Sequence, residues 1–429
     1  MEDNNKTWQP RILILCTQPY HPMVQSRALD SYFHFWDRDN LYQVFSDART
    51  PIKGLCASLY QITDWQLVQR WKKKNAEVGR VFNYSELPDE WEAEVLPTLK
   101  KAKKWKSNGL YRWTRKTLWR KRFWNTDKLN RWIEEMVKPD AIFFCFSPDF
   151  FLLDIVEYIS NKWKIPMFLS ITDDLYFQDH FSLSPFYWLY RAWYKHRIRK
   201  LMKRSVFGVF ESEKIKRKYC DAFHIPGCVQ YIATSLPNVA KVDAPSSILT
   251  ARYLGNIEYG RFESLCQVAD AFLKAGKDIK VEVYSSSYPE IVNKKHPANL
   301  VVKKPVSYDE ALKLMSTADL LLLVEGTKKK DQRDTAYSLS TKVGDTLGSG
   351  RLVLAYGGAE TGALSFLKEK DACLCATNLD ELDSIICSLD NLNKEAVIEK
   401  SLRVAKECFD LNVQAKKWLE EATSLLKKG

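Results

Sequence analysis

The chain has 429 residues, 45% of them hydrophobic, and a formal net charge of +12 at pH 7. This length exceeds one ordinary domain, and the hydrophobic fraction excludes wholesale disorder and supports two sizeable cores. The excess of Lys and Arg predicts an acidic neighbour, which could be nucleic acid, an anionic membrane surface or an anionic substrate.

The ten cysteines show neither a CxxC pair nor the Cys/His spacing of a zinc site. Several fall in apolar runs, where Cys acts as a small hydrophobe, and this pattern favours a reducing cytoplasm. The N-terminal segment is polar, so we expect no secretory signal, and no apolar run approaches the roughly 20 residues of a membrane span. We therefore expect a cytoplasmic protein, whose membrane contact would be peripheral and on the inner face of the cell membrane.

Apolar runs and helical patterns alternate along the first half of the chain. The expected buried strands are residues 11–16, 141–146 and 165–171. A helix is expected at 148–163, between the last two, and this alternation predicts a doubly wound parallel sheet. Ligands in such sheets bind beyond the carboxyl ends of the strands, which points to the loops 17–27 and 172–180.

Polar residues in these two loops are the first candidate site residues. Asp173 and Asp174 end a strand, and adjacent side chains of an extended segment point to opposite sides, so we expect one of them to face a ligand. That carboxylate could act as a base or orient a hydroxyl, or it could be an ordinary loop or capping acid. Three further candidates for contact with an acceptor substrate are His21, Ser26 and Arg27. A packed histidine and a structural ion pair would explain these residues equally well.

Two stretches combine cations with aromatic residues. Residues 100–122 are rich in Lys and Arg, contain no acid and include interleaved Trp and Tyr, and residues 187–204 repeat this pattern. Like charges repel within a helix, so we expect a partner outside the chain to compensate them. Such a surface suits an anionic membrane, whereas nucleic acid is the less favoured partner. The alternative is a solvated cationic face with its aromatic residues in the core.

A Pro-containing polar stretch near 231–250 marks a boundary, after which new elements begin. We place the domains at 1–238 and 239–429, with the basic aromatic insertion at about 95–125. The expected strands of the second half are residues 251–254, 280–284, 319–324 and 352–355. Helices are expected at 262–275, 308–317 and 395–427.

The segment 338–362 reads as a polar turn, a short helix, a glycine turn and a buried strand. A helix N-terminus with a nearby ammonium suits a phosphate group, so Ser340, Thr341 and Lys342 are candidate diphosphate ligands. Asp345 lies one turn after Thr341 and could bind ribose hydroxyls. The alternative is an ordinary capped helix with a solvated lysine and a surface acid.

Three further candidates follow strands of the second half. Gly255 would let the backbone approach a ligand closely, and Asn256, the next residue, would lie beside the same ligand. Arg261 could donate two hydrogen bonds to phosphate oxygens, and Glu325 could accept hydrogen bonds from the hydroxyls of a donor sugar.

The order of these elements resembles glycosyltransferases of the GT-B fold, and most closely glycosyltransferase family 4. The segments that carry the resemblance are YLGN at 253–256 with Arg261, ALKLMSTADLLLLV at 311–324, STKVGDTLGSGRLVLA at 340–355, and residues 165–175 and 209–226. Where the family has paired glutamates, Asp345 stands for the second, but Tyr337 occupies the position of the first. Asp173-Asp174 stands where the family often has His before Asp.

This resemblance implies an α/β protein with two Rossmann-like domains facing a central cleft. The first domain would bind the acceptor, the second the nucleotide sugar, and the last helix would pack back on the first domain. The implied enzyme is a retaining, metal-independent hexosyltransferase without a cofactor, whose donor is a nucleoside-diphosphate sugar. Its catalytic residues would be Asp173, Asp174 and Lys342, and its acceptor a glycan or lipid-linked hydroxyl in bacterial surface polysaccharide synthesis.

Two other functions fit the same sequence. One is a GT-B enzyme that glucosylates DNA, which the net charge permits. The other is a non-catalytic binder of an anionic polymer or membrane on a relic nucleotide fold, which the replacement of a glutamate by Tyr337 favours.

Overall fold

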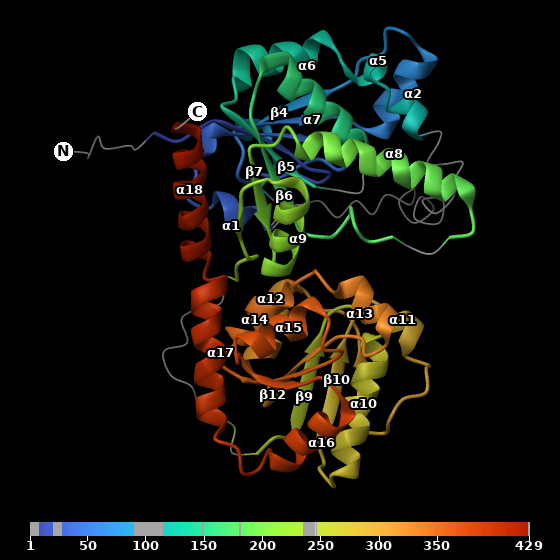
Figure 1. Cartoon of the computed structure of the whole chain (residues 1–429), viewed down its shortest axis with the longest axis vertical. Helices are drawn as coiled ribbons and strands as arrows, with labels where there is room; N and C mark the ends of the chain where they lie inside the picture. The colour runs from blue at the N-terminus through green and yellow to red at the C-terminus, as the bar shows by residue number, and fades with distance from the viewer. Residues whose placement is uncertain are drawn as a thin grey trace, which may run out of the picture. The chain divides into compact units, whose positions relative to one another are not determined.

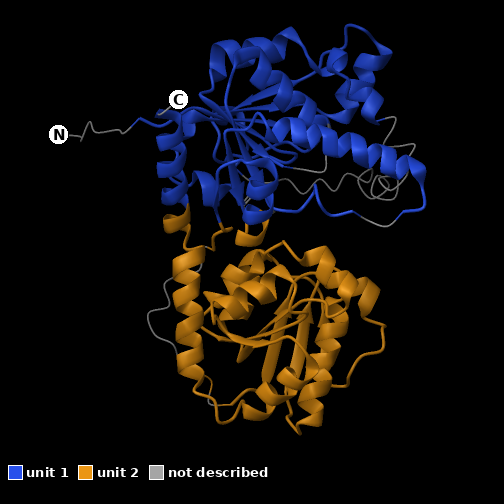
Figure 2. Ribbon diagram, in the orientation of Figure 1, with its two compact units in different colours: residues 1–210, 216–230, 415–429 blue, residues 211–215, 231–414 orange. Residues whose placement is uncertain are grey.

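The computed structural model describes residues 8–19, 28–89, 115–146, 150–179, 182–234, 245 and 247–427. These residues form two compact α/β units (Figure 2). Unit 1 comprises residues 1–210, 216–230 and 415–429, and unit 2 comprises residues 211–215 and 231–414. The predicted boundary at residue 238 and most of the predicted insertion at about 95–125 lie outside the described residues.

Unit 1 is built on a sheet with strand order β4-β3-β2-β1-β5-β6-β7-β8 in the described part of the chain. The strands are β1 (Ile12–Leu15), β2 (Leu41–Phe45), β3 (Ser58–Gln61), β4 (Arg80–Asn83), β5 (Ala141–Cys145), β6 (Met167–Ile171), β7 (Phe207–Phe210) and β8 (Gly227–Val229). Neighbouring strands are parallel except β3 and β4, which are antiparallel. Strands β1, β2, β3, β6 and β7 are buried along their whole length, as expected for a parallel sheet covered on both faces.

Helices connect these strands (Figure 1). They are α1 (Asp30–Phe33), η2 (Arg38–Asn40), α2 (Asp64–Lys72), η3 (Tyr84–Glu86), α5 (Lys121–Trp124), α6 (Asp127–Arg131), the π-helix η4 (Trp132–Val137), α7 (Phe150–Trp163), α8 (Pro185–Met202) and α9 (Glu213–Phe223). Helix α2 begins with a capping box, in which Thr63 and Gln66 satisfy each other's backbone N–H groups. One core cluster joins α1 and the strands to Trp418 near the C-terminus.

Unit 2 is built on a parallel sheet with strand order β11-β10-β9-β12-β13-β14 among its described residues. The strands are β9 (Thr250–Leu254), β10 (Lys280–Tyr284), β11 (Leu300–Lys303), β12 (Leu320–Val324), β13 (Leu352–Tyr356) and β14 (Leu374–Ala376). The chain runs outward from β9 through β10 to β11, and outward in the opposite direction from β12 to β14. Strands β9 and β12 are therefore neighbours at the point where the strand order reverses.

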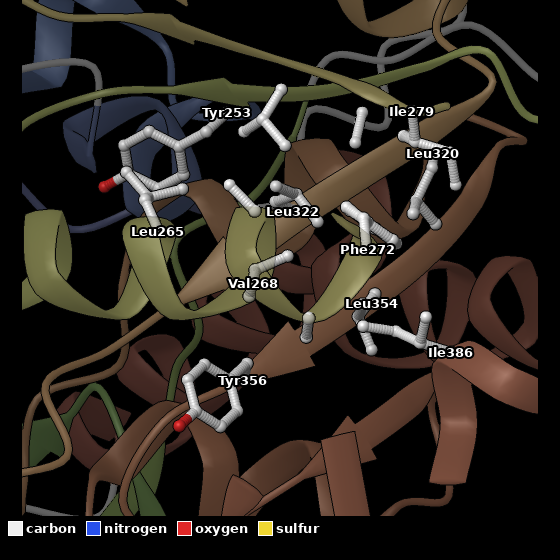
Figure 3. Close-up of a cluster of buried hydrophobic side chains, with 14 of the residues drawn as sticks. Tyr253, Leu265, Val268, Phe272, Ile279, Leu320, Leu322, Leu354, Tyr356 and Ile386 are labelled. Carbon is white, nitrogen blue, oxygen red and sulfur yellow. The ribbon is translucent and has the colours of Figure 1, made fainter. Parts of the chain in front are cut away.

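The helices of unit 2 cover both faces of its sheet. They are α10 (Arg261–Lys274), α11 (Tyr288–Ile291), α12 (Tyr308–Ser316), α13 (Lys329–Thr335), α14 (Lys342–Leu347), α15 (Gly362–Glu369), α16 (Leu379–Ser388), α17 (Lys394–Phe409) and α18 (Leu411–Lys427). Helices α10 and α16 bury Val268, Phe272 and Ile386 against one face (Figure 3). Helices α14, α15 and α17 bury Val343, Leu364 and Phe409 against the other.

The C-terminal helix α18 is divided between the two units. Its first residues, up to Gln414, group with unit 2, and the residues from Ala415 onward group with unit 1. Trp418 and Ala422 are fully buried in the core of unit 1. The apolar side of α18 therefore contributes to the core of unit 1.

The structure confirms the predicted fold class of two doubly wound, Rossmann-like α/β units. The strands expected at 141–146, 280–284 and 319–324 form within one residue of their expected bounds. Between β1 and β2, the described α-helix is limited to Asp30–Phe33. None of the helices in the described parts of the chain has the length and apolar character of a membrane span.

Candidate functional site

The strongest cluster of charged side chains lies in unit 2, at the carboxyl ends of β9 and β12. Gly255 directly follows β9, and Glu325 directly follows β12. Because these strands flank the reversal of strand order, their ends form the place where open α/β sheets bind ligands. Arg261 at the start of α10 and Lys342 at the start of α14 join this cluster.

Arg261 and Glu325 form a buried, two-pronged ion pair. The Nε and Nη2 groups of Arg261 donate to the two carboxylate oxygens of Glu325, both at 3.0 Å. Both side chains are nearly inaccessible to solvent. Burial raises the pKa of Glu325 against the opposing charges of Arg261 and Lys342. Burial has the largest single effect and works to lower the pKa of Arg261, but the charge and hydrogen bonds of Glu325, together with Tyr253 and Tyr259, outweigh it and leave that pKa raised.

Lys342 brings a second cation to the cluster. Its Nζ donates to the hydroxyl of Tyr253 at 2.8 Å and lies 4.5 Å from the centroid of the same ring. No ion pair among the described residues includes Lys342. Burial and then the neighbouring charge of Arg261 lower the pKa of Lys342 to about 7, against the opposing effect of Glu325. The cluster thus contains two basic side chains and one acidic side chain.

Gly255 and Asn256 shape the same cluster. Gly255 has φ of +143°, and a Cβ at this position would lie 2.2 Å from the Nζ of Lys342. Glycine therefore leaves the space in which the ammonium group lies, and it adopts a backbone conformation that other residues rarely take. Asn256 is exposed and accepts a 2.5 Å hydrogen bond from Nη1 of Arg261.

Tyr253 is a member of this cluster that the sequence did not indicate. It lies at one end of the buried core of unit 2 (Figure 3), and its hydroxyl donates to the carbonyl of Asn256. Since the hydroxyl hydrogen is used in this bond, the oxygen accepts from Lys342. The only signal in the sequence was its place two residues before Gly255.

Ser340 and Thr341 precede α14, as expected for this segment. Ser340 is half-buried, Thr341 is exposed, and the hydroxyl of Thr341 makes no capping hydrogen bond to the helix. The N–H of Val343 is not free either, since it donates to the carbonyl of Ser340 at 2.9 Å. The anion-binding capacity of this segment therefore depends mainly on Lys342.

Asp345 is held by two hydroxyl groups within unit 2. One of its carboxylate oxygens accepts from Thr234 at 2.5 Å and from Tyr308 at 3.1 Å. Asp345 is buried, whereas Thr341 is exposed. Both hydroxyl groups bond the same carboxylate oxygen, and the contact of Asp345 with a ribose stays a prediction.

In unit 1, the alternation expected for the two adjacent aspartates is observed. Asp173 is exposed, and Asp174 is buried. Asp174 accepts hydrogen bonds from the N–H of Phe177 at 2.8 Å and the hydroxyl of Tyr219 at 3.0 Å, and it pairs with Lys218 at 3.1 Å. Asp174 therefore ties its loop to α9, and Asp173 is the more accessible of the two carboxylates. His21, Ser26 and Arg27 lie outside the described residues.

Five cations of residues 191–204 form ion pairs with three acids of unit 1, which leaves this stretch with an excess of positive charge. The ion pairs are Arg191–Asp179, Lys195–Asp179, Arg197–Asp154, Arg197–Glu157, Lys200–Glu157 and Arg204–Glu157. Trp119 and Trp124, from the described end of the first basic stretch, are buried in the core. A surface hollow of about 590 Å³ lies beside Asp154 and Glu157, and none of the candidate donor ligands lines it.

Metal ligands are not clustered in the described parts of the chain. No group of three or more His, Cys, Asp or Glu side chains there could hold a metal ion. The charged cluster of unit 2 is cationic, and its chemistry suits an anion.

Comparisons with known proteins identify the fold that this chain shares with other structures. No protein-family model and no curated protein matches the sequence. Among solved structures, a sucrose-phosphate synthase from Thermosynechococcus elongatus matches with a TM-score of 0.57 at 9% identity, over 98% of this chain and 100% of that one. A glycosyltransferase from Rickettsia africae matches with a TM-score of 0.55 at 12% identity, over 98% and 100% of the two chains.

A third structure is an α,α-trehalose-phosphate synthase (UDP-forming) from Burkholderia xenovorans. It matches with a TM-score of 0.55 at 9% identity, over 97% of this chain and 100% of that one. At such identities the comparisons define the fold alone. Together with the two parallel sheets, they show that this chain has the GT-B fold.

Proposed function

We propose that the protein is a glycosyltransferase that takes a hexose-type sugar from a nucleoside diphosphate and transfers it to a hydroxyl group. The observation that carries the proposal is the cationic cluster of Arg261 and Lys342 at the reversal of strand order in unit 2. The GT-B fold supports it as an analogy.

Departure of a nucleoside diphosphate leaves negative charge on the phosphate oxygens. Preorganised cations in a buried setting stabilise that charge more strongly than cations in water. Glu325 fixes two donor groups of Arg261, which orients the guanidinium before a ligand arrives. Lys342, which forms no ion pair with a carboxylate in the described part of the chain, would supply the remaining positive charge.

The decisive experiment measures the binding of nucleotides and of nucleotide sugars. The unfolding temperature of the protein would be recorded with UDP, GDP, CDP and dTDP, and then with the sugar forms of any nucleotide that binds. A bound nucleotide at a hundredfold excess over its Kd is expected to add about 2.7 kcal/mol of stability. Failure of all four to bind would refute the proposal. UDP is the first choice, because a structurally similar enzyme is described as UDP-forming.

The finer parts of the proposal rest on the resemblance to glycosyltransferase family 4. They are retention of configuration, independence from metal, and a glycan or lipid-linked acceptor in bacterial surface polysaccharide synthesis. The anomeric configuration of a product formed from an α-linked donor, measured by NMR, tests the first. Activity that persists in excess EDTA tests the second.

A second candidate is a non-catalytic nucleotide binder on the same fold. Asp174, expected as a catalytic residue, and Asp345, expected as a ribose ligand, are both engaged in hydrogen bonds within their units. Nucleotide binding without donor hydrolysis or sugar transfer, across a panel of glycan and lipid acceptors, would favour this candidate over the enzyme.

We further propose that α8 provides a peripheral membrane contact. Leu183, Phe186 and Leu189, just before and within its first turns, are exposed by 89%, 70% and 68%. Each such side chain contributes about 1.5–3 kcal/mol when fully buried in an apolar environment. Because five cations of residues 191–204 share only three carboxylates, positive charge remains on this stretch, and attraction to anionic headgroups would act together with apolar insertion.

Sedimentation with phosphatidylcholine vesicles, with and without phosphatidylglycerol, tests the membrane contact. The double variant Phe186→Ser/Leu189→Ser should lose binding, whereas Leu273→Ser, which removes an exposed leucine of unit 2, should retain it. Equal binding of both variants would refute the assignment to α8.

A further inference from the structure

Lys342 differs from an ordinary phosphate-binding lysine in its surroundings. Its Nζ has a single hydrogen-bond partner among the described residues, the hydroxyl of Tyr253 at 2.8 Å. That hydroxyl donates its own hydrogen to the carbonyl of Asn256. Burial raises the pKa of Tyr253, so the phenol stays neutral and supplies no negative charge to hold an ammonium ion.

The nearest carboxylate is committed to another cation. Both oxygens of Glu325 accept from Arg261, a side chain that remains charged at every pH of interest. A protonated Lys342 would therefore add a second positive charge next to Arg261 with one negative charge between the two. Without a ligand, this arrangement favours the neutral amine.

Among the described residues, no charged side chain of the other elements that pack on α14 forms an ion pair with Lys342. Helix α17 presents apolar side chains and the buried thiol of Cys408 to the same core cluster. On α14 itself, Asp345 is bound by Tyr308 and Thr234. The groups that act electrostatically on Lys342 are thus Arg261 and Glu325.

We propose that the charged cluster of unit 2 takes up one proton from solvent at the Nζ of Lys342 when a diphosphate binds. The amine lone pair accepts the proton, the resulting ammonium pairs with a phosphate oxygen, and release of the diphosphate returns the proton. This inference rests on the proposed function, because the diphosphate is the group that restores the balance of charge. A nucleotide product would then be held more tightly at low pH and released more readily at high pH.

The pKa of about 7 for Lys342 sets the range for the test. Titration calorimetry would be run with UDP or GDP, whichever binds, at pH 8.0 in phosphate, HEPES and Tris. The slope of the observed enthalpy against the buffer's ionisation enthalpy gives the number of protons taken up. The second phosphate ionisation lies near pH 6, so the nucleotide itself stays fully ionised at pH 8.0.

We expect uptake approaching one proton at pH 8.0, and a Kd that rises by up to about tenfold per pH unit above pH 8. Lys342→Arg keeps a permanent cation, so it should bind with no proton uptake and a nearly constant Kd between pH 7.5 and 9. Lys342→Met should bind more weakly, also without uptake, which keeps the test valid if arginine does not fit beside Gly255.

The possible outcomes separate the two proposals. Nucleotide binding without proton uptake, or uptake that persists in Lys342→Met, would overturn the protonation of Lys342 and leave the proposed function standing. If no nucleotide binds the wild-type protein at any pH, the proposed function fails and the inference fails with it.

Discussion

Two buried carboxylates, one in each unit, follow parallel strands but have different charge surroundings. Asp174, after β6, is bonded to one cation, one hydroxyl and one backbone N–H. Glu325, after β12, is bonded to Arg261 and lies within the electrostatic reach of a second base, Lys342. The first arrangement is balanced and suits a structural role, whereas the second has an excess of basic groups that an anion would complete.

The largest effect is expected from breaking the ion pair of unit 2. Arg261→Ala would leave Glu325 buried without its partner, which costs about 3–5 kcal/mol of folding stability. Urea unfolding measures this loss. The double variant Arg261→Met/Glu325→Leu removes both charges and should recover most of the stability while nucleotide binding stays lost. A double variant as unstable as Arg261→Ala would contradict this account.

The second largest effect is expected from removing Lys342, which has no ion-pair partner among the described residues. Lys342→Ala should weaken nucleotide binding by about 10–100-fold, the range of one charge-assisted hydrogen bond. The control is Lys304→Ala, which removes an exposed lysine of the same unit and should leave Kd unchanged. Calorimetry at pH 6.5, where Lys342 is largely protonated, gives the clearest contrast. Equal affinities of the two variants would remove Lys342 from the site.

The balanced carboxylate of unit 1 is expected to give a smaller effect, and on stability. Asp174→Asn should cost about 1–3 kcal/mol, because Lys218 loses its carboxylate partner and faces an amide group, whereas Tyr219 keeps an acceptor oxygen. Asp173→Asn, at the exposed neighbour, should stay within about 0.5 kcal/mol. If Asp173→Asn instead abolished sugar transfer with stability intact, the exposed aspartate would gain a catalytic role.

The smallest effect is the pH dependence of folding stability. The pKa of Lys342 falls from 10.5 to about 7 on folding, so the unfolded chain binds more protons than the folded chain between these values. Stability due to this group therefore rises with pH across that window, is lost progressively as the pH falls from about 10.5 towards 7, and does not change further well below pH 7. The gain from pH 7 to pH 8 is about 1 kcal/mol. Lys342→Met should lack it, and an unchanged pH profile would show that Lys342 titrates normally.

The local sequence pattern was sufficient to predict the buried strands, but it was insufficient to predict which side chains pair across the fold. The apolar runs at 280–284 and 319–324 form strands as predicted, since a continuous apolar run suits a parallel sheet covered on both faces. The short, half-exposed strand β4 was missed, because its side chains do not form such a run. Of the donor-site candidates, Gly255, Arg261, Glu325 and Lys342 come together, and Asn256 bonds to Arg261.

The sequence by itself determined the two α/β halves, the strand-to-glycine turn at Gly255 and the basic residue at the start of the 342–347 helix. These features depend on residues close together in the chain, where apolar periodicity and backbone preference act. Only the tertiary structure decided that Arg261 pairs with Glu325, 64 residues away, and that Tyr253 holds Lys342. It likewise decided that acids of α7 and of the loop before α8 pair with several cations of α8. Such pairings follow from strand order and the helix faces that pack together, and local sequence does not encode them.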